Sequence, residues 1–153
     1  MKQFELGGKL LLTNDTVVSV GSPYATGSFP YWISNPTGAT IKKVKVMLGR
    51  VVAGVSGGSV TVSLYKSDDP KTDGSHARSS SPNSGVPAEF IRENWDLIGS
   101  IDMTYADNNV LYPAEYKITN IALDKPTFLI GLIKVAGDIQ ATNIFLWAEY
   151  EDN

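Results

Sequence analysis

Apolar residues recur at every second position along most of this chain, in short runs separated by turn residues. In residues 43–48 and again in residues 59–65, a branched apolar residue alternates with a polar or more flexible one. Successive side chains of a β-strand point to opposite faces, so each run has one face for a core and one for solvent. This period predicts an all-β protein.

The runs predict about eight strands in one domain, residues 1–153, with the architecture of an antiparallel, jelly-roll-like β-sandwich. The turn residues between them include the NPTG sequence at residues 35–38 and clusters of Gly, Asn or Asp. The expected strands are 9–13 and 16–20 around Asn14-Asp15, and then 28–34, 40–50, 59–66, 95–104, 116–122, 128–135 and 143–150. The expected turns and connections are 21–27, 54–58, 107–109 and 137–138.

Three expectations concern how these strands are arranged. Residues 40–50 and 59–66 should lie side by side, because consecutive strands usually neighbour one another. Residues 128–135 are almost wholly apolar, which predicts a central strand buried on both faces, starting after Pro126. In the strand 95–104, the odd-numbered residues from Trp95 to Met103 should share one face.

Two segments lack the alternation. Residues 1–8 have little pattern, so they are interpreted as an N-terminal arm. Residues 67–94 are rich in Ser, Pro, Asp, Asn and Gly and predict a long inserted loop, with a short helical turn at 88–92. Loops of this length in a compact domain are usually functional or disordered. The arm and the loop are therefore candidates for segments that order on assembly.

Composition excludes several kinds of chemistry. The absence of cysteine excludes disulfides, thiolate metal sites and cysteine nucleophiles. The net charge is −3 and the one basic cluster is Lys42, Lys43 and Lys45, interpreted as the lysines of a solvated or edge strand, so no nucleic acid is expected. No apolar run approaches the roughly 20 residues of a membrane span, and no leader precedes residue 1 in this interpretation.

Catalytic and metal sites have weak support. His76 is the only histidine and lies in the polar loop, without a partner to orient it for catalysis. Glu115 and Glu149 lie on strands, where paired acids across a cleft or plain surface charge are the alternatives. The sequence DDPKTDG at residues 68–74 offers oxygen ligands for calcium, but its spacing does not match the alternating acids of an EF-hand loop, so an ordinary polar loop is the favoured interpretation. We therefore expect no enzyme, no cofactor and no metal.

Aromatic side chains provide the candidate binding residues. Tyr65, and either Trp32 or Trp147, are out of phase with the core face of their strands. An exposed aromatic on a sheet contacts a protein or stacks on a sugar, and the alternative is packing under a loop. We expect Tyr65, Trp32 and Trp147 in an interface, together with the loop arginines Arg78 and Arg92.

The strand pattern, the NPTG turn and the strand SVTVSLYK at residues 59–66 resemble small jelly-roll virion proteins of tailed phages. That resemblance implies a structural protein of a virus particle: a capsid decoration protein, homotrimeric, bound to the major capsid protein and located in the virion. The chain is also similar to carbohydrate-binding β-sandwich modules. The alternative function is therefore a glycan- or receptor-binding module of a phage fibre or baseplate.

Overall fold

The computed structural model describes residues 1–13, 15–21, 30–68, 95–105, 108–111 and 114–153. This part of the chain is all-β and its strands pair antiparallel, as the alternation predicted. The strands are β1 (Lys2–Thr13), β2 (Val17–Val20), β3 (Tyr31–Ile33), β4 (Ala39–Ser67), β5 (Asp96–Tyr105), β6 (Asn108–Leu111), β7 (Ala114–Leu123) and β8 (Thr127–Asp152). The long loop 67–94, apart from Ser67 and Asp68, lies outside the described residues, as do residues 22–29 and the helical turn at 88–92.

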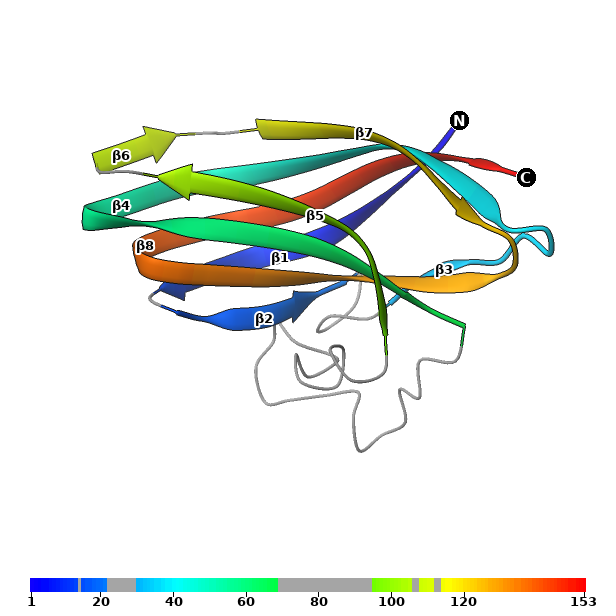
Figure 1. The fold of residues 1–153 in the computed structure, drawn as a ribbon, viewed down its shortest axis with the longest axis horizontal. Helices are drawn as coiled ribbons and strands as arrows, with labels where there is room; N and C mark the ends of the chain where they lie inside the picture. Colours follow the sequence, from blue (N-terminus) through cyan, green and yellow to red (C-terminus); the bar gives the residue numbers. More distant parts are fainter. Residues whose placement is uncertain (14, 22–29, 69–94, 106–107, 112–113) are drawn as a thin grey trace.

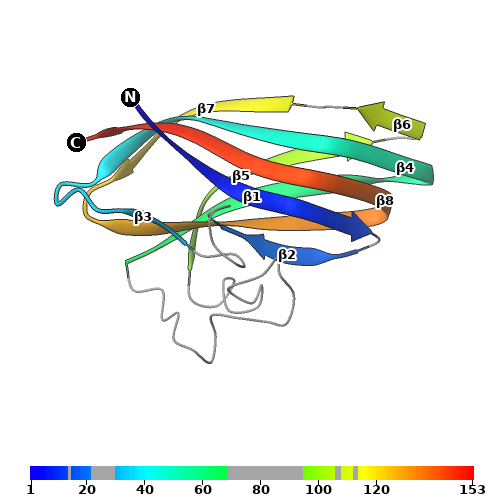
Figure 2. The same ribbon diagram turned by 180° about the vertical axis from the view of Figure 1, so that it is seen from behind.

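Two long strands, β4 and β8, form the frame of the molecule. They pair along their whole length, from Ala39 opposite Asp152 to Ser67 opposite Phe128. The ribbon folds over between residues 53 and 58, where Gly57 and Gly137 take positive φ angles of 65° and 87°. Figures 1 and 2 show the two halves of the ribbon lying over each other. Strands that bend in this way make the corners between packed sheets.

This corner corrects two expectations. Residues 54–58 and 137–138 are not loops, because both remain within their strands. Residues 40–50 and 59–66 are not neighbours either: each pairs with a different half of β8. The turn residues were located correctly, but a bend in a two-stranded ribbon needs the same glycines as a hairpin.

Each half of the ribbon belongs to its own layer. The β1 layer has the order β7, first half of β4, second half of β8, β1. Strand β6 pairs with residues 50–53 of β4, on the same side of β4 as β7. The β5 layer has the order β5, second half of β4, first half of β8, and then β2 and β3. This winding of a ribbon into two layers is that of a jelly roll, so the fold class is confirmed.

The core lies between the layers and follows the period-two pattern. The alternating residues Val44, Val46 and Leu48 of one layer face Val62 and Leu64 of the other, and all five are buried. The apolar run 128–135 is a central strand: Leu129 and Ile133 enter this core. Ile130 and Leu132 on the opposite face join Trp95 in a second buried cluster. The prediction of burial on both faces is thus confirmed.

The first residues form a strand and not an arm. Strand β1 starts at Lys2 and pairs with β8 from Lys2 opposite Tyr150 onwards. Phe4 and Leu6 are buried in the core, while Gln3 and Glu5 point the other way. The alternation is present in this segment, but it covers only two apolar residues before the glycines at 7 and 8 interrupt it. That is too short a run to be distinguished from an irregular terminus.

A register shift in β5 corrects the expected face of Leu97. Gly99 lies opposite Leu64 but Leu97 lies opposite Tyr65, so one extra residue of β5 bulges there. A bulge reverses the faces of the residues beyond it. Ile101 and Met103 therefore enter the main core as expected, whereas Leu97 is 56% exposed and Trp95 joins the second cluster.

Two smaller expectations are also corrected. Residues Asn108 and Asn109 begin β6 and are not part of a turn. The lysine cluster at residues 42–45 does not lie on an edge strand, because this part of β4 pairs with β7 on one side and β8 on the other. In the described part of the chain, no helix has the length and apolar character needed to cross a membrane.

Candidate functional site

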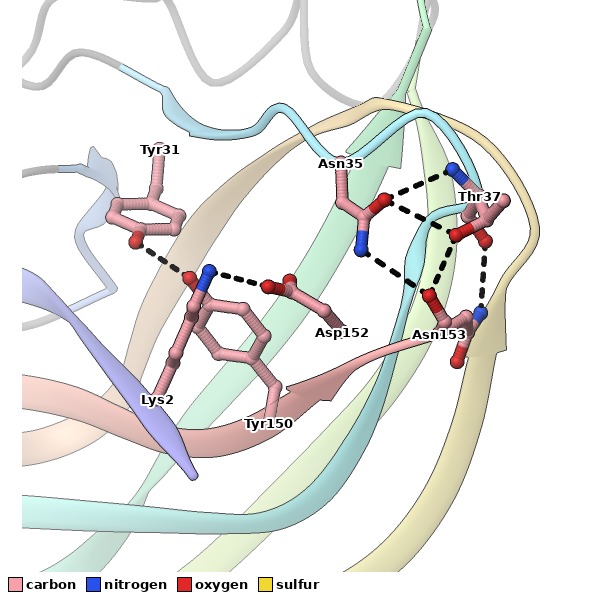
Figure 3. Close-up of polar contacts among 7 residues, drawn as sticks. All are labelled: Lys2, Tyr31, Asn35, Thr37, Tyr150, Asp152 and Asn153. Carbon is pink, nitrogen blue, oxygen red and sulfur yellow. Dashed lines mark hydrogen bonds and ion pairs between the residues drawn. The ribbon is translucent and has the colours of Figure 1, made fainter.

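A polar groove of about 460 Å³ lies at the end of the sandwich where the two ends of the chain meet. Its walls come from the start of β1, from β3 with the residues that follow it, and from the end of β8 (Figure 3). The groove is lined by Lys2, Tyr31, Trp32, Ile33, Ser34, Asn35, Pro36, Tyr150 and Asp152. Its volume is in the range of small-ligand sites, about 300–1,000 Å³.

Two tyrosines from different layers form one wall of the groove. The hydroxyls of Tyr31 and Tyr150 lie 2.9 Å apart in a hydrogen bond. The ring of Phe4 stacks on Tyr31 at 4.9 Å between centroids and contacts Tyr150 at a tilt. Burial, and after it the hydrogen bond with Tyr31, raises the pKa of the Tyr150 hydroxyl. This cluster joins β1, β3 and β8 at the wall of the groove.

One ion pair gives the groove both a cation and an acceptor. The Lys2 ammonium donates to the Asp152 carboxylate, and this bond lowers the pKa of Asp152 below its ordinary value. Both side chains are solvent-exposed in part, and exposed pairs of this kind contribute little to stability. The two charges cancel, so the groove presents polar groups without a net charge from the pair.

The NPTG turn supplies a second wall, held in place by the end of the chain. The Asn35 carboxamide oxygen accepts hydrogen bonds from the Thr37 amide and hydroxyl, both at 3.1 Å, and the Asn35 carbonyl accepts from Gly38 N–H at 2.8 Å. The Asn153 side chain donates to the carbonyl oxygens of Thr37 and Leu123 at 3.1 and 3.0 Å. Figure 3 shows how the bonds between Asn153 and the turn residues Asn35 and Thr37 join the turn to the end of the chain. The turn predicted from NPTG is confirmed.

Trp32 provides an open aromatic surface at the groove. Its neighbours Tyr31 and Ile33 point toward the core, so Trp32 points outwards, as the sequence predicted for this strand. Its indole is tilted against Phe128 at 4.2 Å between centroids and is 43% exposed. Among the aromatic side chains that the structure describes, it alone is exposed.

The other predicted interface residues lie elsewhere. Tyr65 is half-buried against the second cluster on the outer face of the β5 layer. Trp147 is half-buried on the outer face of the β1 layer, with the Lys45 ammonium 5.8 Å from its ring centroid. Arg78 and Arg92 lie outside the described residues. Of the five predicted interface residues, Trp32 is the one that the structure places in the groove lining. The interface role of Tyr65, Trp32, Trp147, Arg78 and Arg92 stays a prediction.

Of the acids considered for catalysis or metal binding, only Asp68 and Glu149 have side chains in the described part of the chain. Asp68 pairs with Lys125, which lowers the pKa of that carboxyl, and Glu149 lies on the outer face of the β1 layer. His76, Asp69, Asp73 and the Glu115 side chain lie outside the described part. Within that part, no three acidic or histidine side chains gather in a way that could hold a metal ion.

Sequence reasoning missed most of the groove. Lys2 and Asp152 are 150 positions apart and meet only because β1 pairs with the last residues of β8. The alternation correctly places the Tyr31 ring toward the core. Nothing in the sequence indicates that its hydroxyl lies at the groove. The NPTG turn and Trp32 were the recognisable parts, because the turn chemistry and the strand alternation are both local.

Comparisons with known proteins find similar solved structures but no similar sequence family. No family model matches the chain, and no curated protein matches it. Among solved structures, the chain is similar to the C-terminal CBM6 of the laminarinase LamC from Zobellia galactanivorans, with 14% identity over 97% of this chain and 100% of that one, at a TM-score of 0.36. It is also similar to the carbohydrate binding module CBM6cm-2 of Cellvibrio mixtus lichenase 5A in complex with cellotriose, with 15% identity over 97% and 96%, at a TM-score of 0.35. At such low scores and identities, the likeness says nothing of what this chain binds.

Proposed function

We propose that this protein is a glycan-binding β-sandwich and that the groove beside Trp32 holds a neutral sugar. The observation that carries the proposal is the exposed indole next to a groove of polar side chains. A pyranose has an apolar face of C–H groups and a rim of hydroxyls. Aromatic rings cover the first, and amide, hydroxyl and carboxylate groups bond the second.

The groove supplies both kinds of contact. Asp152 is an acceptor for sugar hydroxyls, and Lys2 and Asn35 carry donors. Because Lys2 and Asp152 neutralise each other, an acidic sugar gains no net attraction from the pair. The groove is also held open by the bonds between Asn153 and the turn, so little ordering accompanies binding.

The acidic side chains in the described lining of the groove favour sugar binding over sugar hydrolysis. Asp152 is the only acid among the described residues that line the groove, and it is paired with Lys2. Glycoside hydrolysis commonly needs two carboxyl groups, about 5–9.5 Å apart, across the scissile bond. The proposal is accordingly for a binding protein.

The Trp32→Ala variant tests this proposal. An array of neutral and acidic oligosaccharides identifies a ligand for the wild type, and calorimetric titration with that soluble oligosaccharide gives the affinity. We expect Trp32→Ala to weaken binding about 5- to 150-fold, taking for the sugar ring the roughly 1–3 kcal/mol that stacking on an aromatic side chain contributes for a nucleic-acid base. Trp32→Phe should retain most of the affinity.

Trp147→Ala is the matched control, because it removes an equal indole whose ring lies against Lys45 and outside the groove. It should bind the oligosaccharide as the wild type does. A wild type that binds no sugar on the array, or a Trp32→Ala variant with unchanged affinity, contradicts the proposal.

The capsid-decoration role, the trimer and the virion location stay predictions from the sequence resemblance. None of the described contacts supports them. Copurification of the protein with virus particles would test that role directly and independently of sugar binding.

A further inference from the structure

Two opposite charges occupy the core-facing side of their strands. On β1, Lys2 lies two residues before the buried Phe4. On β8, Asp152 lies two residues after the buried Tyr150. Residues two apart on a strand share a face, so both charged side chains point to the side on which the core lies. At this end of the sandwich that side is the groove, and both residues line it.

Lys2 and Asp152 are the two charged side chains among the described residues of the groove lining. The Lys2 ammonium donates to the Asp152 carboxylate, as Figure 3 shows. This bond, and less strongly a bond from the Asn35 side chain, lowers the pKa of Asp152, which favours the charged form of the carboxylate. The Asp152 side chain is 32% exposed and the Lys2 side chain 60%, so the carboxylate is the more enclosed of the two charges.

The ion pair treats neutral and anionic sugars differently. A uronate or sulfate group that pairs with Lys2 must also lie close to Asp152, because the two side chains are bonded to each other. Two like charges about 4 Å apart weaken binding about fivefold in water, and more where water is partly excluded. A neutral sugar meets no such repulsion and can use the carboxylate as an acceptor for its hydroxyls.

We propose that Asp152 excludes anionic sugars from the groove by holding Lys2 in an ion pair. This inference rests on the proposed glycan function and names the residue that decides its charge selectivity. An unpaired Lys2 would attract uronates, sulfated sugars and other polyanions alike. Asp152 cancels that attraction and supplies the repulsive contact that specificity commonly requires. It is thus an acceptor toward neutral sugars and a barrier toward anionic ones.

Matched pairs of sugars test this role. An array carries glucan, mannan and galactan tetrasaccharides, each beside its counterpart oxidised at C6 to the uronate, and titration of the full chain gives the affinities. The wild type should bind at least one neutral member, and should bind its uronate counterpart at least about fivefold more weakly. In Asp152→Asn an amide of similar shape replaces the carboxylate, so the affinity for the uronate should rise at least about fivefold.

Variants of Lys2 show whether its ammonium is the cation involved. Combining Lys2→Met with Asp152→Asn should cancel the gain in uronate affinity, because neither charge of the pair remains. Lys2→Met alone leaves the carboxylate unpaired and should bind the uronate more weakly than the wild type does. These variants should keep the melting temperature of the wild type, since exposed ion pairs contribute little to stability.

Glu151→Gln is the matched control. It removes the same charge from the neighbouring residue of β8, whose carboxylate lies 3.8 Å from the Lys42 ammonium and is not part of the groove lining. It should leave both affinities unchanged. The gain in Asp152→Asn should also shrink between about 0.1 M and 1 M salt, because the Debye length falls from about 10 Å to about 3 Å. A change of shape without a change of charge would not depend on salt in this way.

A wild type that binds a uronate as tightly as its neutral counterpart overturns the proposal. So does a normally folded Asp152→Asn variant that gains no affinity for any uronate, and so does an equal gain in Glu151→Gln. The glycan function and the role of Asp152 can fail separately. If the wild type binds no neutral sugar but Asp152→Asn gains uronate binding that requires Lys2, the glycan function alone is rejected. Neutral-sugar binding without that gain rejects the role of Asp152 alone.

Discussion

Phe4→Ala should lower the free energy of unfolding by about 3–5 kcal/mol, the usual cost of removing a buried aromatic ring. Phe4 is 3% exposed, stacks on Tyr31 and contacts Tyr150. Its loss would leave a cavity between the edges of the two layers and free the tyrosine pair that forms a wall of the groove. Urea unfolding followed by circular dichroism measures the change, and a constant m-value would show that the native state stays compact.

Gln3→Ala is the control, because Gln3 is the exposed neighbour of Phe4 on the same strand. Its effect should stay within about 0.5 kcal/mol. The pair of variants distinguishes a structural strand from an arm. If Phe4→Ala were as mild as Gln3→Ala, residues 1–8 would be an arm after all, and the pairing of β1 with β8 would be wrong in solution.

Gly38→Ala should destabilise the protein by more than the about 1–3 kcal/mol that a strained backbone conformation alone costs. Gly38 has a φ of +76°, and an added Cβ would lie 1.7 Å from the Leu123 carbonyl oxygen. That oxygen belongs to the backbone of β7 and accepts a hydrogen bond from Asn153, so it cannot move without breaking the contact between β7 and the end of the chain. Thermal and urea unfolding should both show the loss.

Gly99→Ala is the matched control for Gly38→Ala. An added Cβ at Gly99 meets only the Ile121 side chain, at an ordinary contact distance of 3.7 Å. This variant should be as stable as the wild type or more stable by about 0.4–1 kcal/mol, because alanine lowers the entropy of the unfolded chain. Equal stability of Gly38→Ala and Gly99→Ala would contradict the turn geometry described above.

The candidate site could be predicted only where its chemistry is local. The NPTG turn was recognisable because a short amide side chain, a proline and a glycine stabilise one another within four residues. Trp32 was identified as out of phase with its strand, which the structure confirms. Lys2 and Asp152 were not found, since their contact depends on a pairing between the two ends of the chain.

The sequence by itself determined most of the strands and, outside the bulge in β5, their inward faces. The period of two at Val44, Val46 and Leu48 decides which side chains are buried, because strand geometry alone turns neighbours to opposite faces. Only the tertiary structure decided which strands pair, as the continuous pairing of β4 with β8 shows. Strand pairing is non-local, because it depends on the register between distant segments and on the bends at Gly57 and Gly137. The alternation of apolar residues within one segment carries no information about either. The groove and the outer face of the β1 layer are products of that pairing, so they exist only in the folded chain.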